Sequence, residues 1–167
     1  MHTPDGENEH INKLGELIKD IRFAMLTTIC DDGSLRSRPM TTQEMEFDGD
    51  LWFFTSDATP LVGEVKKENH VNVSYADADD NRYVSVSGVG EMVHDRKKIE
   101  ELWNPAYKAW FPKGLEDPNI ALIKVHVENA EYWDSPSSKL VALAGFVKAL
   151  ATGKQYDGGG EHEKLEL

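Results

Sequence analysis

The stretch SLRSRPM, residues 34–40, carries two arginines two positions apart in an otherwise acidic chain. In an extended strand, residues i and i+2 share one face, so Arg36 and Arg38 are expected to point the same way. Guanidinium groups bind phosphates and carboxylates through paired hydrogen bonds. The spacing therefore predicts a site for a phosphate-sized anion at the edge of a sheet.

A second stretch, LWFFTS at residues 51–56, ends in an aromatic residue and two hydroxyls, Phe54, Thr55 and Ser56. Thr59 and Pro60 follow, and they suit the N-cap and the first position of a helix. Hydroxyls, exposed amides at a helix start and nearby arginines are the ingredients of a phosphate site. The alternative is that the hydroxyls only finish a strand, while the arginines pair in solvent with a carboxylate of Glu44, Glu46 or Asp57.

Aromatic residues gather in an irregular stretch rich in Pro and Gly, ELWNPAYKAWFPKGLEDPN at residues 101–119. A further block, AEYWDSP, adds Tyr132 and Trp133. Aromatics in such a loop cover a cleft, line a flat ligand or pack against another subunit. We expect a ligand or interface role for Trp110 and Trp133, and a structural role for Trp103, which closes an amphipathic helix.

Other site chemistries find no support in the sequence. The six histidines form no HxxxH or HExxH pair, and a single cysteine, Cys30, cannot build a zinc site or an internal disulfide. No GxSxG, GxxxxGK[ST] or GxGxxG motif is present, and GVGEM at residues 88–92 is expected to mark a bulge or a close backbone approach. We therefore expect no metal site, and the sequence names no catalytic acid or base.

Composition bounds the class of protein. The chain has 167 residues, 40% of them hydrophobic, which suits one globular domain with a real core. A net charge of -12 argues against nucleic acid or an anionic membrane as a partner, because both need a basic face. No signal peptide opens the chain, and no apolar run approaches the roughly 20 residues that cross a bilayer. With one cysteine, these features predict a cytoplasmic protein.

The elements that position these residues alternate between helices and pairs of strands. Residue spacing predicts helices at about residues 10–21, 60–69, 95–104 and 135–153, and strands at 23–30, 34–46, 51–56, 70–77, 81–95, 119–127 and 130–134. The strand at 51–56 is expected to be buried on both faces, and Ser137 or Ser138 to cap the last helix. This order predicts an α+β fold with a mostly antiparallel sheet curled into a barrel. Residues 1–9 are expected to be flexible, 10–153 to form the domain, and 154–167 to be a flexible tail unless it docks on a partner.

Several of these stretches resemble the general stress protein branch of the FMN-binding split-barrel superfamily, which is related to pyridoxamine 5'-phosphate oxidase. The resemblance is carried by FAMLTTICDDGSLRSRPM, LWFFTS, ENHVNVSYAD, ELWNPAYKAWFPKGLEDPNIALIKV and AEYWDSPSSKLV, and it runs from about residue 10 to the C-terminal helix. The last two blocks are the most specific to this branch. The resemblance implies a six-stranded antiparallel split β-barrel with flanking helices.

The resemblance also implies a cofactor and an assembly. The family binds flavin at the interface of a homodimer, with both chains lining each site; FMN is the expected cofactor, with FAD and a deazaflavin as alternatives. Carried over residue by residue, the flavin-binding positions are Arg36, Ser37, Arg38, Pro39 and Met40, then Phe54, Thr55 and Ser56, and finally Trp133 close to the flavin ring. We add Trp110 from the aromatic loop.

The sequence departs from the pattern of oxidase relatives at the positions that grip the phosphate. An Arg-Lys pair there is replaced by Pro60 and Leu61, and a basic position closing the arginine strand by Thr41. These differences argue against pyridoxamine 5'-phosphate oxidase activity and predict weak retention of FMN, which Leu61→Lys is expected to tighten. The leading function is a flavin-binding protein of the general stress type, with weak flavin-dependent oxidoreductase activity as one option. The alternatives are a non-enzymatic flavin carrier or sensor, and a dimeric interaction module without cofactor.

Overall fold

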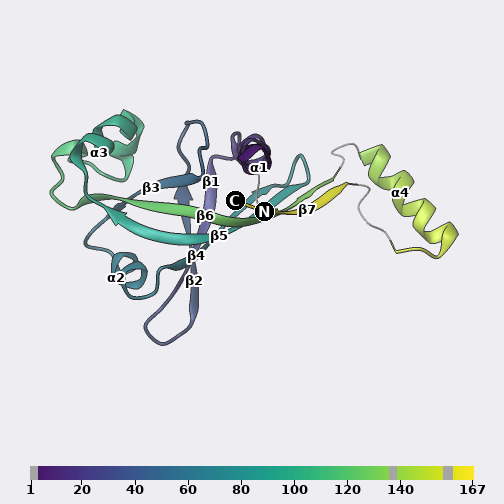
Figure 1. The fold of residues 1–167 in the computed structure, drawn as a ribbon, viewed down its shortest axis with the longest axis horizontal. Coiled ribbons are helices and arrows are strands. Elements are labelled where there is room, and N and C mark those ends of the chain that lie inside the picture. The colour runs from purple at the N-terminus through teal and green to yellow at the C-terminus, as the bar shows by residue number, and fades with distance from the viewer. Residues whose placement is uncertain (1–3, 136–138, 156–159) are drawn as a thin grey trace.

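The computed structural model describes residues 4–135, 139–155 and 160–167, which are built around one antiparallel sheet (Figure 1). Within these residues the helices are α1 (Pro4–Ile18), α2 (Pro60–Lys67), α3 (Arg96–Leu102) and α4 (Lys139–Thr152). The strands are β1 (Phe23–Ile29), β2 (Leu35–Thr41), β3 (Asp50–Ser56), β4 (His70–Asp77), β5 (Arg82–Val93), β6 (Ile120–Asp134) and β7 (Glu161–Glu166). Two short 3-10 helices, η1 (Pro105–Ala109) and η2 (Gly114–Glu116), follow α3. No helix in the described ranges is long and apolar enough to cross a membrane.

The sheet is curled and left open between two of its strands. The strand order is β2-β1-β4-β5-β6-β3, and β7 pairs with β6 outside this path. One edge of β6 pairs with β5, while its other edge is divided between β3, along Ile120 to His126, and β7, along Asn129 to Asp134. β2 and β3 stand at the two ends of the order. The fold is therefore the expected α+β split barrel: six antiparallel strands form a curled, open half-barrel with flanking helices, and β7 is added at one edge.

Alternating apolar residues give the sheet one buried face. Along β4, Val71, Val73 and Tyr75 are buried, while Asn72 and Ser74 between them face the other way. Helices α1 and α2 pack on this buried face, and their apolar residues Leu14, Leu17, Leu61 and Val65 join one continuous core with it. Burying these side chains away from water is the main force that holds the helices on the sheet.

The opposite face of the sheet, here called the outer sheet face, stays exposed. Its large exposed apolar side chains are Phe23, Met25, Leu35, Tyr83 and Trp133, each at least 39% exposed. Two rows of facing residues cross β2, β1, β4 and β5 without a charged side chain, namely Pro39, Met25, Ser74 and Ser85, and Ser37, Thr27, Asn72 and Ser87. An uncharged face of this extent is notable because 29% of the chain is charged.

The chain ends differ from the sequence expectation. Helix α1 begins at Pro4, not near residue 10, because Pro4 suits a first helical turn and the acids that follow it complement the helix dipole. The tail expected to be flexible holds strand β7, and Leu165 in it is buried in the core. This strand pairs with an edge of β6 that would otherwise carry unpaired backbone groups. Ser137 and Ser138 lie outside the described residues, while Gly153 follows α4 with a φ of 66°.

Two strand expectations also change. The two strands predicted at residues 119–127 and 130–134 form one continuous strand, β6. The polar residues between them form a β-bulge opposite Ser87 and Gly88, where the register of the pairing shifts. The expected close approach at GVGEM is confirmed, since a Cβ on Gly88 would lie 2.1 Å from the His126 carbonyl oxygen. Strand β3 is fully buried on one face only, and Trp52 and Phe54 on its other face are half-buried. Trp52 lies beside Lys98 of α3, and Phe54 packs on the aromatic segment after α3.

Candidate functional site

A cavity of about 470 Å³ lies between the ends of β2 and β3, where the half-barrel is open. Four parts of the chain form its wall: the end of β2 and the residues after it, the end of β3, the start of α2, and the aromatic segment around η1. The lining residues are Arg38, Pro39, Met40, Thr41, Gln43, Phe54, Thr55, Ser56, Thr59, Pro60, Leu61, Tyr107, Trp110 and Phe111. The cavity therefore joins the two stretches that the sequence singled out to the aromatic loop.

Most of the predicted binding residues meet in this space. Arg38, Pro39 and Met40 come from β2, Phe54, Thr55 and Ser56 from β3, and Trp110 from the loop. Arg36, Ser37 and Trp133 are not among the lining residues. Ser37 lies on the outer sheet face, where its hydroxyl is 2.7 Å from that of Thr27.

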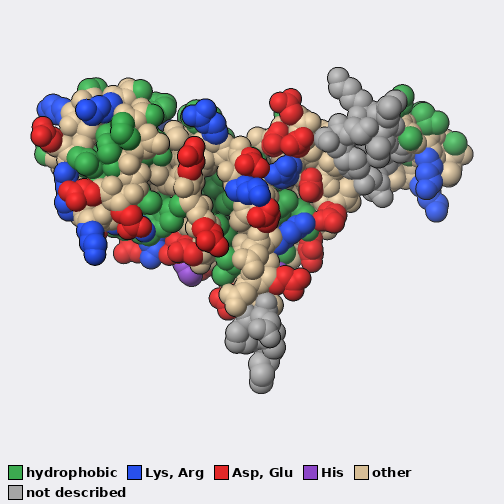
Figure 2. Space-filling model, turned by 90° about the horizontal axis from the view of Figure 1, so that it is seen from above, with side chains coloured by type: hydrophobic (Ala, Val, Ile, Leu, Met, Phe, Trp, Pro, Cys, Tyr) green, Lys and Arg blue, Asp and Glu red, His purple; other side chains and the backbone are tan. Residues whose placement is uncertain are grey.

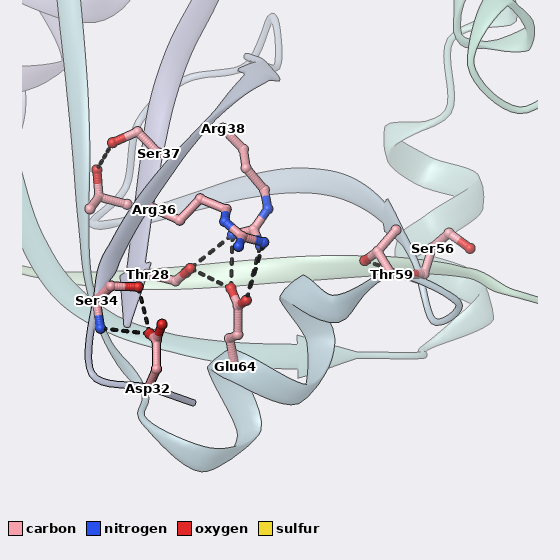
Figure 3. A network of polar contacts seen from close by, with 10 residues as sticks. Thr28, Asp32, Ser34, Arg36, Ser37, Arg38, Ser56, Thr59 and Glu64 are labelled. Atoms are coloured by element: carbon pink, nitrogen blue, oxygen red, sulfur yellow. Dashed lines mark hydrogen bonds and ion pairs between the residues drawn. The ribbon is translucent and has the colours of Figure 1, made fainter. Parts of the chain in front are cut away.

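Arg36 and Arg38 share one face of β2, as their spacing predicts, and both reach toward the same carboxylate (Figure 3). The two Nη atoms of Arg38 lie 2.9 and 3.1 Å from the two carboxylate oxygens of Glu64, and Arg36 Nη1 lies 3.9 Å away. The alternative of solvent pairs with Glu44, Glu46 or Asp57 is wrong, because the carboxylate beside both arginines is that of Glu64. Asp57 instead pairs with His94 at 2.8 Å.

The Glu64 carboxylate is buried and fully satisfied. Thr28, which has no exposed surface, donates its hydroxyl to Glu64 at 2.8 Å and accepts from Arg38 at 2.9 Å. The hydrogen bond from Arg38 holds the pKa of Glu64 below its usual range, against the opposing effect of burial, and Thr28 and Cys30 lower it further. The site therefore carries a carboxylate beside its arginines, and that charge offsets the attraction of Arg38 for an anion.

The polar end of the cavity lies where β3 leads into α2. The Thr59 hydroxyl donates to the Ser56 carbonyl at 2.9 Å, and the Ser56 hydroxyl accepts from the Ala58 amide at 3.3 Å. Thr59 is the N-cap of α2, but its side chain bonds no helix amide. Ser56, Thr59 and the start of α2, the positive end of the helix, thus line the cavity together with Arg38.

The other wall of the cavity is aromatic. Phe54 packs edge-on against Trp103 with ring centres 5.7 Å apart, and against Tyr107 at 5.2 Å. The Tyr107 hydroxyl donates to Gln43 Oε1 at 3.1 Å, which ties the aromatic segment to the residues after β2. Trp110 is 59% exposed at the cavity. Trp103 is packed in a small satellite core, which fits the structural role expected for it.

The comparisons with known proteins agree with this architecture. Residues 9–157 match the family model described as pyridoxamine 5'-phosphate oxidase like. The chain belongs to this family. Protein bli-3 from Neurospora crassa is 31% identical over 157 residues, which cover 88% of this chain and 75% of that protein.

Solved structures of family members resemble the chain as well. One is described as a general stress FMN/FAD binding protein from Xanthomonas citri; it is 31% identical, has a TM-score of 0.68, and the match covers 78% of this chain and 92% of that one. A candidate general stress protein 26 from Jannaschia sp. CCS1 is 25% identical with a TM-score of 0.74, over 97% of this chain and 100% of that one. The expected likeness to the general stress branch is confirmed.

Pro60 and Leu61, which replace the Arg-Lys pair of the oxidase relatives, differ in their exposure to solvent. Pro60 is exposed at the start of α2 and lines the cavity, whereas Leu61 is only 3% exposed and belongs to the main core. A lysine in place of Leu61 would lose core packing and bury an ammonium group. Leu61→Lys is therefore the wrong substitution with which to restore a phosphate-binding cation, and Pro60 is the suitable position.

Trp133, which the family resemblance places near the flavin ring, lies on the outer sheet face of its own chain. It stacks on His162 with ring centres 5.1 Å apart and planes 14° apart, and His162 Nε2 lies 2.7 Å from a Glu131 carboxylate oxygen. Sequence reasoning missed Glu64, Tyr107 and Gln43. The aromatic loop that it quoted contains Tyr107, but no local pattern marks Glu64 or Gln43. In the described residues no group of acids, histidines and cysteine has the arrangement of a metal site.

Proposed function

We propose that this protein binds FMN in the cavity between β2 and β3 and belongs functionally to the general stress type of flavin-binding protein. The observation that carries the proposal is the composition of that one cavity. Its lining combines one arginine, four Ser and Thr residues and the start of a helix with the aromatic side chains of Phe54, Tyr107, Trp110 and Phe111. Its volume of about 470 Å³ falls within the range of small-molecule sites. The 31% identical Xanthomonas citri protein described as FMN/FAD binding supports the same ligand class.

The chain's own residues would hold and orient the flavin. Arg38, Ser56 and Thr59 would serve the phosphate end, and Phe54, Tyr107 and Trp110 would serve the planar ring. The bound flavin would supply the redox chemistry, so a weak flavin-dependent oxidoreductase activity is consistent with this site.

A carrier or sensor without turnover is the second candidate, and the lining of the cavity favours it over acid-base catalysis. Among the described lining residues only Arg38 and Tyr107 ionise. Burial raises the pKa of Tyr107, which makes this hydroxyl a poor acid or base near neutral pH. Steady-state oxidation of reduced nicotinamide by the flavin-loaded protein distinguishes the two functions, because a carrier shows none above free FMN.

We further propose that the site lies in a homodimer that buries the outer sheet face. Two rows of this face are uncharged across β2, β1, β4 and β5, and the face exposes Phe23, Met25, Leu35, Tyr83 and Trp133. It continues into the cavity, because Pro39 lines the cavity and pairs with Met25 in the same sheet. A second copy packed on this face would bring its Trp133 toward the first copy's cavity, as the family resemblance implies.

The test is to purify the protein, release bound small molecules by denaturation and identify them by mass, and then to add FMN to the stripped protein. The proposal expects FMN among the released molecules, or saturable uptake of added FMN with the visible spectrum of a bound flavin. A protein that releases no flavin and also fails to bind added FMN would contradict it.

A further inference from the structure

A second cavity, of about 710 Å³, adjoins the cavity proposed for the flavin. Its wall is formed by the residues that follow α1, the residues after β2, and the end of α3 together with η1. The two linings share four residues, namely Thr41, Gln43, Tyr107 and Trp110. Arg38, Ser56 and Thr59, which are proposed to hold the phosphate, line only the first cavity. The second cavity therefore adjoins the aromatic residues proposed for the flavin ring and not those proposed for its phosphate.

Two amide side chains that line the second cavity have their oxygens already occupied. Gln43 Oε1 accepts from the Tyr107 hydroxyl at 3.1 Å, and Asn104 Oδ1 accepts from the Ala106 amide at 2.9 Å as the N-cap of η1. Within the part of the chain that the structure describes, no residue accepts a hydrogen bond from either NH2 group. Because an amide NH2 group only donates, a ligand that satisfies both must bring acceptor oxygens.

The charges of the second cavity disfavour an anionic ligand. Its charged lining residues are three acids and two bases, namely Asp20, Glu44, Glu101, Lys19 and Arg22. Lys19 already pairs with Glu16 at 2.8 Å, and Glu101 pairs with Lys98 at 3.2 Å. This leaves one base, Arg22, and two acids, Asp20 and Glu44. A phosphate-bearing ligand would be repelled by this excess of acids, whereas a cationic ligand would bring further donors to two NH2 groups that need acceptors.

Aromatic side chains complete the lining of the second cavity, namely Phe23, Trp103, Tyr107 and Trp110. Figure 2 shows hydrophobic side chains over the end of the molecule that holds α3, with acidic and basic side chains mixed among them. Aromatic rings pack against flat ligands face to face or edge to face. A flat ligand therefore suits this lining better than a flexible chain.

We propose that the second cavity binds an uncharged, flat molecule that carries two carbonyl oxygens, of the quinone class. The NH2 groups of Gln43 and Asn104 donate to the two carbonyl oxygens, and the aromatic side chains pack on the quinone ring. The inference adds a second ligand to the proposed function, and it rests on that function only for the position of the flavin ring beside the quinone. Binding of the quinone itself requires only the second cavity.

The test is equilibrium dialysis of three flat aromatic probes against the full chain, once stripped and once loaded with FMN. Duroquinone (tetramethyl-1,4-benzoquinone) is an uncharged acceptor, benzoate an anionic acceptor and benzamidinium a cationic donor. All ring positions of duroquinone are substituted, so it does not add to the free thiol of Cys30. We expect duroquinone to bind about tenfold or more tightly than either of the other two probes.

Two variants remove the proposed donors and keep the bonds that hold the structure. Asn104→Asp retains an oxygen that caps η1, and Gln43→Glu retains an acceptor for the Tyr107 hydroxyl, but both replace an NH2 group by an oxygen. Each is expected to weaken duroquinone binding about tenfold. Asn12→Asp, which makes the same change at an exposed position of α1, is the control and should alter the affinity about twofold or less. Circular dichroism checks that the variants are folded.

The outcomes separate the quinone site from the flavin site. A wild type that binds no duroquinone in either form, or binds it with an affinity that neither Asn104→Asp nor Gln43→Glu lowers, overturns the proposal. Tighter binding of benzoate overturns it in favour of an anion site at Arg22, and tighter binding of benzamidinium overturns it in favour of a cation site. A stripped protein that fails to take up FMN but binds duroquinone through Asn104 contradicts the proposed flavin function and supports the quinone site.

Discussion

At the scale of residues, the buried pair of Arg38 and Glu64 connects the stability of the fold to the charge of the site. A buried charge is tolerated because it is paired and hydrogen-bonded, and removing one member of such a pair strands the other. Arg38 is mostly buried against Glu64, whereas Arg36 is largely in solvent and 3.9 Å away. The two arginines therefore contribute unequally to the stability of the fold, although their spacing in the sequence suggests equivalent roles.

We expect Arg38→Ala to lower the free energy of unfolding by about 3 kcal/mol, because it leaves the Glu64 carboxylate buried without its main partner. Arg36→Ala should cost about 1 kcal/mol or less, as exposed ion pairs do. Urea unfolding of the two variants measures both values. Equal effects would mean that the carboxylate is not held by Arg38 in solution.

Glu64 should also set the preference of the cavity for a phosphate. Glu64→Gln keeps an oxygen that can accept from Arg38 but removes the negative charge, so we expect FMN to bind about fivefold more tightly relative to riboflavin, which lacks the phosphate. Glu68→Gln, the same change at the end of α2 and away from the cavity, is the control. Calorimetric titration gives the ratio of the FMN affinity to the riboflavin affinity. The same ratio in the wild type, Glu64→Gln and Glu68→Gln would mean that the phosphate binds elsewhere.

The shared face of the two arginines was predictable from the sequence, whereas their partner was not. Strand periodicity alone orients Arg36 and Arg38, because successive side chains alternate between faces. Glu64 lies 26 residues beyond Arg38, on a helix that packs across the sheet, and only the tertiary fold brings them together. Its position among apolar helix residues gave no local indication of a charge network.

At the scale of elements, the start of α2 decides how strongly the site can hold an anion. The helix offers its positive end and the residues Thr59 and Pro60 to the cavity, but no basic side chain. Pro60 is exposed, so a cation placed there needs no space in the core. A new ammonium group at this position opposes the helix dipole slightly but attracts a phosphate directly.

We therefore expect Pro60→Lys to tighten FMN binding by about 1 kcal/mol, roughly fivefold, at low salt and by less at high salt. Pro60→Gln, which adds a polar chain without charge, should leave the affinity near the wild-type value. Titrations of FMN at two salt concentrations test this expectation. A gain with Pro60→Gln as large as that with Pro60→Lys would show that the loss of proline, not the added charge, is responsible.

Hairpins and helices were predictable where turn residues and periodicity were both present, as at Gly33 and Gly49, which adopt positive φ. The bulge that joins the two halves of β6 and the return of β7 were not, because both depend on pairing between distant segments. Glu161–Glu166 is mostly polar, so its single core residue, Leu165, is too little to mark a strand in the sequence.

At the scale of the whole molecule, the outer sheet face and Trp133 allow a test of whether one chain or two chains form the flavin site. Trp133 lies outside the cavity of its own chain and stacks on His162. The resemblance to the family predicted a shared site, and this residue is the position at which a two-chain arrangement can be tested.

A mixing experiment tests the two-chain site. Trp133→Ala is expected to weaken FMN binding by about 1 kcal/mol through lost ring contact, and Ser56→Trp to fill the cavity. If each site combines one chain's cavity with the other chain's Trp133, a dimer of one chain of each kind holds one site of wild-type affinity and one dead site. Calorimetry of the mixed dimer, isolated with two different affinity tags, should find that site. A mixed dimer whose intact cavity binds FMN as weakly as the Trp133→Ala homodimer would mean that Trp133 acts within its own chain, and a Trp133→Ala homodimer of wild-type affinity would mean that Trp133 does not contact the flavin.

The most direct measurement of the central claim is a calorimetric titration of FMN into the stripped wild type and into Ser56→Trp. The cavity between β2 and β3 predicts one FMN bound per chain in the wild type and affinity reduced by about 100-fold or more when the tryptophan fills that space. A wild type that binds no FMN, or a Ser56→Trp variant that binds it unchanged, would contradict the assignment of this cavity as the flavin site.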